Sequence, residues 1–267
     1  MPEKKRVTAS RSPKEYISYV VDFVLRTLLT FNINKQLILY ATIVTGLSIF
    51  TDIQRPGPSY FSNKNNVLNQ YFVKQGWGWT LIAVTTLQLI TSLIKYKGEI
   101  KNISQSVLRL IILTLYWYIC THSFEWLENF TGSCTNTTLL LKRPCLREGY
   151  NWLGFDISGH CFLLIFSLTI FNEEAQVLHH VSKRLDDIER AKDNRSTESS
   201  LLSPNAYRVL LRLSMLLLML LTVIWLVMLV ATSLYFHTTA QKVLGMLVAV
   251  IGWFLVYKIF NLGEGVH

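Results

Sequence analysis

The sequence predicts an all-α membrane protein with six transmembrane helices and one amphipathic helix near the N-terminus. Of the 267 residues, 51% are hydrophobic, and the mean hydropathy is +0.32, which is too apolar for a soluble domain of this size. The apolar residues gather in runs close to the ~20 residues of a bilayer crossing. Lys and Arg stand in blocks between these runs and do not alternate with aromatic residues as nucleic-acid grooves require. The net charge of +9 therefore indicates membrane topology, and we expect no nucleic-acid partner.

The first expected element is an amphipathic helix from Ile17 to Leu28, within a cytosolic N-terminal region of residues 1–36. Its apolar residues recur at helical spacing, while Asp22 and Arg26 lie off that stripe. This pattern is typical of a helix that lies on a membrane surface, although a plain extension of the first transmembrane helix is the alternative. The N-terminus lacks the short apolar core and cleavage site of a signal peptide, so we expect the first internal apolar segment to direct insertion.

Six apolar segments then form a predicted transmembrane domain of residues 37–260, which contains a cytosolic loop at 181–207 and precedes a cytosolic tail at 261–267. They are Leu37–Phe50, Gly76–Ile94, Val107–Phe124, Cys161–Leu178, Leu210–Phe236 and Val243–Phe260. The first is short, and Glu173-Glu174 interrupt the fourth, with both carboxylates expected near the cytosolic surface. We expect the fourth helix to continue to about Ala191 before a flexible linker begins.

The basic residues set the orientation of these segments. Most of the 26 Lys and Arg residues, Arg109 included, fall in segments on the side of the N-terminus. Because positive residues favour the cytosolic side, both termini are predicted to be cytosolic. The loops predicted to face the lumen are 51–75, 125–160 and 236–242.

The second of these loops carries two further marks of a lumenal environment. Asn129 and Asn136 each begin an N-glycosylation sequon. Cys134 and Cys145 share the loop, and an oxidising lumen would allow them to form a disulfide. Spacing alone does not prove that they pair.

A polar cluster, Asp156-Ile157-Ser158-Gly159-His160, stands at the start of the fourth apolar segment. Ionisable groups at membrane depth are costly and usually mark a site, although an ordinary helix start with an acid or Ser158 as the N-cap is the alternative. The predicted topology places His237 and several basic residues on the same membrane face. Two imidazoles beside cations suit an anionic lipid-like substrate, because cations hold phosphate oxygens while one His attacks and the other donates a proton.

Several longer segments occur in a specific order and spacing. They are Ser59–Lys74, Trp117–Thr121, Phe130–Cys134, Gly154–His160, and Tyr235–His237 with Gln241-Lys242-Val243 and Gly245. Together they resemble the fat storage-inducing transmembrane family, closest to its type 2 branch, over about Ser59 to Gly252. The resemblance implies an endoplasmic reticulum protein needed for lipid droplet formation and related to lipid phosphate phosphatases. It also implies a hydrolase that cuts fatty acyl-CoA into acyl 4′-phosphopantetheine and adenosine 3′,5′-bisphosphate.

The same resemblance implies catalytic roles. His237 matches the histidine that attacks phosphorus, and His160, which follows Ser158 and Gly159 in the matching motif, protonates the leaving group. Asp156 and Ser158 complete the predicted catalytic set. The phosphatases orient the nucleophile with an acid four residues further on, where this chain has Gln241, so we assign the supporting role to Asp156.

The basic residues of the phosphatases' first motif have no clean match in this chain, so the phosphate must be held differently. The residues that we expect at the substrate are Lys64, Lys74, Gly159, Gln241 and Lys242. We expect neither a metal nor another cofactor, since positioned histidines need none.

Two other functions remain open at this level. The protein would bind and partition neutral lipid such as diacylglycerol or triacylglycerol without catalysis, or it would transport protons or metal through His122, His160, His237 and Glu173. The transporter is disfavoured, because no spaced series of acids crosses the membrane.

Overall fold

The computed structural model describes residues 13–54, 56–96, 100–194 and 203–260. The predicted tail at 261–267, the first twelve residues and positions 195–202 of the predicted loop lie outside the described residues. Within the described ranges, six helices are long and apolar enough to cross a membrane, which confirms the predicted all-α class. These spans are Ile33–Ile53, Gly76–Ile94, Ser104–Thr131, Gly159–Ile188, Asn205–Tyr235 and Thr239–Ile259.

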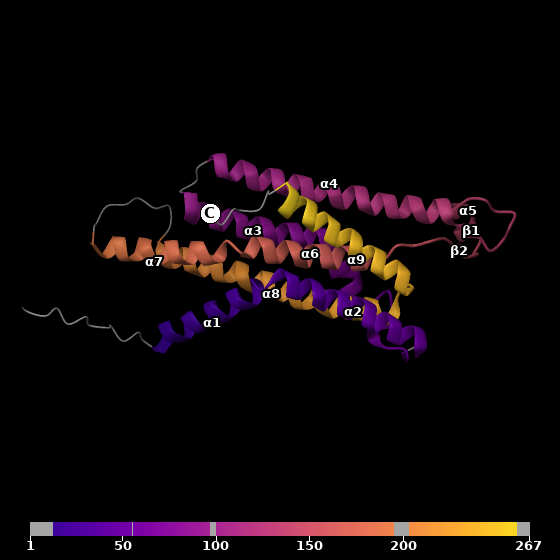
Figure 1. The fold of residues 1–267 in the computed structure, drawn as a ribbon, viewed down its shortest axis with the longest axis horizontal. Helices are drawn as coiled ribbons and strands as arrows, with labels where there is room; N and C mark the ends of the chain where they lie inside the picture. The colour runs from indigo at the N-terminus through magenta and orange to yellow at the C-terminus, as the bar shows by residue number, and fades with distance from the viewer. Residues whose placement is uncertain (1–12, 55, 97–99, 195–202, 261–267) are drawn as a thin grey trace, which may run out of the picture.

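The N-terminal part forms two separate helices, α1 (Pro13–Leu29) and α2 (Ile33–Ile53). Asn32 divides them because its side chain caps α2 by accepting hydrogen bonds from the amides of Asn34 and Lys35. Helix α1 runs obliquely beside the start of α8 in Figure 1 and buries Leu25 and Leu29, while most of its other apolar side chains stay exposed. It is therefore not an extension of α2, and its place at the membrane surface stays a prediction.

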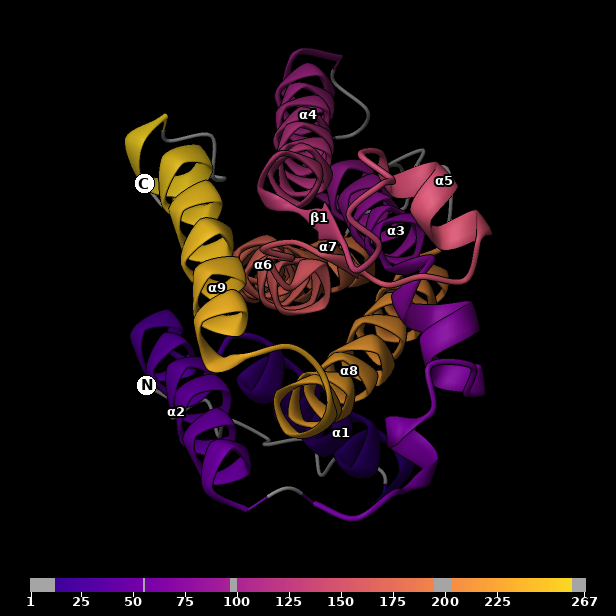
Figure 2. The ribbon, with the colours of Figure 1, turned by 90° about the vertical axis from the view of Figure 1, so that its right-hand side faces the viewer.

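Helix α6 (Gly159–Ala175) is the centre of the bundle. Figure 2 shows it surrounded by α3 (Gly76–Tyr96), α4 (Ile100–Thr131), α8 (Pro204–Tyr235) and α9 (Thr239–Phe254). Its apolar side chains are distributed around the whole helix, and such a helix is stable when other helices cover it. In the fourth span 83% of the most apolar stretch is buried, against 11% in the third, so α4 presents most of its surface outward.

The fourth span continues beyond α6 as predicted, with one interruption. A turn at Gln176-Val177 separates α6 from α7 (Leu178–Asn194). The sixth span ends in a π-helical segment, η3 (Leu255–Ile259), whose residues Val256 and Tyr257 are buried.

An ion pair inside the bundle corrects two predictions. The sequence predicts Arg109 in a cytosolic segment and both Glu173 and Glu174 near the cytosolic surface, but the side chains of Arg109 and Glu174 lie inside the bundle and are only 2% and 4% exposed. Arg109 binds Glu174 through Nε at 2.6 Å and donates from Nη2 at 2.9 Å. Gln88 of α3 and Tyr257 of η3 also donate to this carboxylate, at 2.9 and 2.8 Å. A buried acid is tolerated here because every donor is supplied by another helix, which no hydropathy profile records.

The connection between α4 and α6 folds into a small unit at one end of the bundle. Strand β1 (Ser133–Cys134) pairs antiparallel with β2 (Trp152–Leu153), and the short helix α5 (Lys142–Arg147) lies between them in the chain. Cys134 and Cys145 are joined by a disulfide. The indole of Trp152 donates to the carbonyl of Glu128 near the end of α4, so the unit is fastened to that helix.

Candidate active site

The structure brings the predicted catalytic residues together at the end of the bundle that carries this small unit, which we call the histidine end. His160 lies on the first turn of α6, and His237 lies in the link between α8 and α9. The two rings are near enough for a charge on His237 to act on His160. Asp156 arrives on the segment between β2 and α6, and its carboxylate Oδ2 lies 3.6 Å from Nδ1 of His237. Segments more than seventy residues apart in the chain thus meet at one site.

His237 has an unusual backbone conformation. Its φ is +58°, in the left-handed region that few residues other than glycine adopt. The following residues hold this turn, because Thr238 and Gln241 form a reciprocal capping box at the start of α9. Backbone strain of this kind costs about 1–3 kcal/mol and tends to occur at functional sites, where the surrounding structure enforces it.

Burial controls the protonation of this pair. It lowers the pKa of His237 below 6.5, while the nearby carboxylate of Asp156 and a hydrogen bond with Gln241 act in the opposite direction. Burial also raises the pKa of Asp156 above 3.8, opposed chiefly by the charge of His237. The lowered pKa of His237 leaves its ring neutral near pH 7, which is the state that a nucleophile requires.

Lys64 lies in a loop near the site, and asparagine side chains of that loop hold its backbone in place. This loop includes η1 (Tyr60–Ser62) and η2 (Leu68–Val73). The side chain of Asn69 donates to the carbonyl of Lys64 at 2.6 Å, and Asn66 accepts from the amide of Asn69 at 2.7 Å. The Lys64 side chain is exposed, and its charge acts on both histidines and on Asp156. The asparagines of this motif therefore fix the position of Lys64.

The other two candidate lysines differ in position. Lys74 is exposed, donates to the side chain of Gln70 at 2.9 Å, and lies near enough for its charge to act on His160. Lys242 is instead 1% exposed, and its ammonium donates to the carbonyl of Ser233 in the last turns of α8 at 2.8 Å. The expectation that Lys242 is open to a phosphate is therefore wrong. Its side chain joins α9 to α8 behind His237.

Ser158 and Gly159 occupy the start of α6, where they shape the site. The Ser158 side chain is fully buried and caps the helix by accepting from the amide of Cys161, so the helix-start alternative holds for this residue in place of a catalytic role. Its own amide donates to the carbonyl of Gln241 at 3.1 Å, which joins α6 to α9. A methyl group at Gly159 would meet no atom within 4 Å, so this face is open.

Gly245 sets the distance between α6 and α9, and Gly245→Ala should lower activity strongly. An added Cβ would lie 2.5 Å from the carbonyl oxygen of Ser158, a backbone atom that cannot move without shifting the start of α6. We expect turnover of the purified protein to fall tenfold or more, because a 1 Å misplacement of catalytic groups can cost about 10²-fold. Gly46→Ala is the matched control, because a Cβ there meets nothing within 4 Å. Equal turnover of the two variants would contradict this role.

Several charged residues lie near the site without any signal in the sequence that connects them to it. Asp52, near the end of α2, accepts from the hydroxyl of Thr239 at 2.7 Å. Glu128 pairs with Lys142 at 2.6 Å, and both charges act on Asp156. They come from three separate segments, so no spacing in the sequence connects them. His122 stays on α4, where its Nδ1 lies 2.9 Å from the carbonyl of Tyr118.

The two sequons differ in setting. Asn129 lies in the last turn of α4 and is exposed, whereas the side chain of Asn136 accepts hydrogen bonds from Thr138 within the loop. In the part of the chain that the structure describes, no three His, Cys, Asp or Glu side chains gather closely enough to hold a metal ion.

Comparison with known proteins confirms the resemblance. A family model described as fat storage-inducing transmembrane protein matches residues 57–128 and 128–257. The acyl-coenzyme A diphosphatase FITM2 of Xenopus laevis is 34% identical over 228 residues, covering 83% of this chain and 80% of the relative. The human protein of that name is 34% identical over 227 residues, covering 82% and 79%. The Drosophila melanogaster protein is 30% identical over 268 residues, covering 94% and 63%. No solved structure matches the chain. With its motifs, its six spans and these relatives, the chain belongs to the fat storage-inducing transmembrane protein family.

Proposed function

We propose that this protein is a fatty acyl-CoA diphosphatase that works through a histidine nucleophile and supports lipid droplet formation. The observation that carries the proposal is the contact between Asp156 and Nδ1 of His237, at 3.6 Å, beside His160. Asp156, from another segment, thereby takes the place of the orienting acid that the phosphatases carry where this chain has Gln241. The relatives named acyl-coenzyme A diphosphatase provide the substrate class.

The geometry supports a two-step reaction. The carboxylate of Asp156 lies 3.6 Å from Nδ1 of His237, and we expect this distance to shorten to a hydrogen bond when substrate binds, which would direct Nε2 toward one phosphorus of the pyrophosphate. Nε2 attacks, the bond from that phosphorus to the bridging oxygen breaks, and the electron pair leaves with the departing phosphate, which takes a proton from His160. Water then attacks the phosphohistidine and gives a proton to His160, while the P–N bond breaks and its electron pair returns to neutral His237.

Two kinds of group hold the phosphates. Lys64 and Lys74 supply positive charge from the exposed loop. The amides of Gly159 and His160 precede the first capped amide of α6, and a helix N-terminus favours an anion. The acyl chain lies along the apolar outer faces of the helices, so the reacting phosphates stay at the water-facing rim.

The cellular setting follows from the charge distribution. With the basic blocks cytosolic, both termini face the cytosol and the histidine end faces the lumen of the endoplasmic reticulum. The disulfide between Cys134 and Cys145 and the sequons at Asn129 and Asn136 lie at that end, which suits an oxidising, glycosylating compartment.

Product analysis tests the proposed function. Purified protein in neutral detergent is incubated with oleoyl-CoA, and the products are identified by mass spectrometry. We expect adenosine 3′,5′-bisphosphate and acyl 4′-phosphopantetheine in equal amounts, with activity retained in chelator. Release of free CoA instead would show thioester hydrolysis and overturn the proposal. Binding of diacylglycerol without any turnover would favour the neutral-lipid alternative.

The pH profile should separate the two roles of Asp156. Because burial lowers the pKa of His237, the acid limb of kcat/KM should lie below pH 6.5. The carboxylate of Asp156 raises that pKa, so Asp156→Asn should move the acid limb to still lower pH and reduce the plateau about tenfold or more. Glu125→Gln, an exposed acid on α4 at the same end, is the control. If the plateau falls but the acid limb does not move, Asp156 only holds its loop in place and does not act on the pKa of His237.

A further inference from the structure

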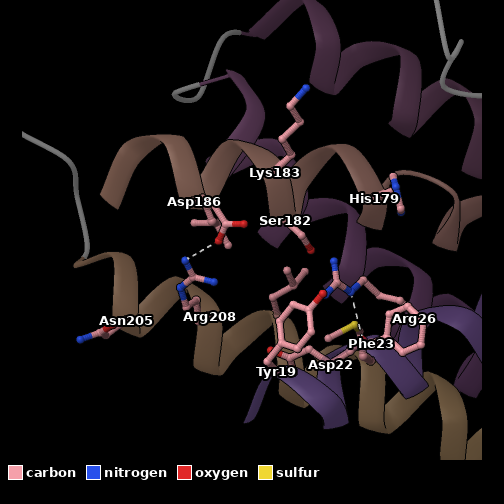
Figure 3. Close-up of a pocket in the computed structure, with 13 residues that line it drawn as sticks. Tyr19, Asp22, Phe23, Arg26, His179, Ser182, Lys183, Asp186, Asn205 and Arg208 are labelled. Atoms are coloured by element: carbon pink, nitrogen blue, oxygen red, sulfur yellow. Dashed lines mark hydrogen bonds and ion pairs between the residues drawn. The ribbon is translucent and has the colours of Figure 1, made fainter. Parts of the chain in front are cut away.

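A cavity of about 850 Å³ lies at the end of the bundle opposite His160 and His237. Its walls are α1, α7 and the start of α8, as Figure 3 shows. Its volume falls in the range of about 300–1,000 Å³ that is usual for ligand sites. The proposed diphosphatase reaction makes no use of it.

Two ion pairs hold the walls of the cavity in place. Asp22 of α1 accepts from Nε and Nη2 of Arg212 at 2.7 and 2.8 Å. Asp186 of α7 pairs with Arg208 at 2.8 Å. Both arginines belong to α8, so that helix fastens the other two walls and at the same time neutralises the two carboxylates that line the cavity.

The cavity keeps an excess of positive charge after these pairs form. Arg26 also lines it and has no carboxylate partner in the described part of the chain, whereas the amine of Lys183 points away from the other lining residues in Figure 3. Arg26 uses Nε for the carbonyl of Asp22 at 3.0 Å, which leaves its terminal nitrogens for a ligand. Figure 3 shows the guanidinium groups of Arg26 and Arg208 between the helices, with Ser182 pointing from α7 toward α1. Guanidinium groups bind phosphate oxygens in paired hydrogen bonds, so the site suits a phosphate group.

Depth and surroundings indicate a lipid as the source of that phosphate. The fifth span has 31 residues and is therefore about 46 Å long, whereas the hydrocarbon core is about 30 Å thick. The first turns of α8, which carry Arg208, then lie at headgroup depth. The side chain of Phe23, which lines the cavity on α1, is exposed and offers an apolar surface for acyl chains.

We propose that the cavity between α1, α7 and α8 binds the phosphate-bearing headgroup of an anionic phospholipid, in the leaflet opposite the histidine end. Arg26 binds the phosphate oxygens through its terminal nitrogens, and Ser182 donates its hydroxyl. Basic pockets at a membrane surface are a known means of anionic lipid recognition. This site is independent of the diphosphatase reaction and would stand if that proposal failed.

Native mass spectrometry of the full-length protein tests the site. The protein in neutral detergent is titrated with phosphatidylinositol 4-phosphate and, separately, with phosphatidylcholine. We expect the anionic lipid to bind about tenfold more tightly, and Arg26→Gln to remove that preference, since it deletes one charge-assisted contact. Arg26→Gln breaks no carboxylate pair, so it should fold. Arg147→Gln, exposed on α5 at the histidine end, is the control with the same change of charge.

The outcomes separate the possible ligands. Equal binding of the two lipids, or a loss in the Arg147 variant as large as in the Arg26 variant, would overturn the proposal. A third titration uses soluble inositol 1,4-bisphosphate as competitor. We expect it to displace the lipid poorly, because it lacks acyl chains. Displacement at equal concentration would overturn the assignment of a lipid and indicate a soluble phosphate.

Discussion

His237→Ala should abolish acyl-CoA cleavage while leaving the protein folded. The side chain is 19% exposed and lies at the rim of the site, outside the hydrophobic core, so its removal should cost little of the packing that holds the bundle together. Loss of an attacking side chain costs far more than loss of a supporting group, and we expect turnover to fall at least about 10³-fold. The measurement is the rate of adenosine 3′,5′-bisphosphate release, with thermal unfolding in the same detergent as the check on folding.

His160→Ala should give a distinguishable result. A residue that only protonates the leaving group contributes about 10²- to 10⁴-fold, so the residual rate should exceed that of His237→Ala. A phosphohistidine should be trapped by acid quench in the wild type and be absent from His237→Ala. If both alanine variants keep full turnover, the histidine mechanism is wrong.

Arg109→Met should destabilise the protein more than any other single change outside the site. It would leave the carboxylate of Glu174 buried without its ion pair, and breaking such a pair usually costs about 3–5 kcal/mol. For a chain of this size we expect the midpoint of thermal unfolding to fall by about 10 °C. The remaining donors, Gln88 and Tyr257, are neutral and do not compensate a full charge.

A double variant separates charge from packing. Arg109→Met with Glu174→Leu removes both charges, and since a buried pair and an apolar pair of similar volume are often equally stable, most of the lost stability should return. Arg208→Met is the matched control, because its pair with Asp186 is 30% and 52% exposed and such pairs contribute about 0.2–1 kcal/mol. A double variant as unstable as Arg109→Met would show that the pair is not the cause.

Residues in local patterns were the predictable part of the site. The sequence indicates His160 and His237 because both lie at the same predicted end of the transmembrane helices and both match motifs of the family. Asp156 was assigned a supporting role from its neighbours in the chain, but its position 3.6 Å from Nδ1 of His237 depends on how β1, β2 and the disulfide direct the segment before α6. Lys242 lies at the same end of the bundle as the histidines but is turned inward to the carbonyl of Ser233, which its spacing does not indicate.

The number of helices, their approximate limits and the end of the bundle that carries the histidines follow from the amino-acid sequence. These properties depend on local periodicity and on the length of apolar runs, which are present in each segment before it meets another. The central position of α6, the burial of Arg109 against Glu174 and the cavity beside α1 come from packing between segments far apart in the chain. A polar side chain becomes a core residue or a ligand according to the partners that other helices supply, and those partners are set when the helices assemble.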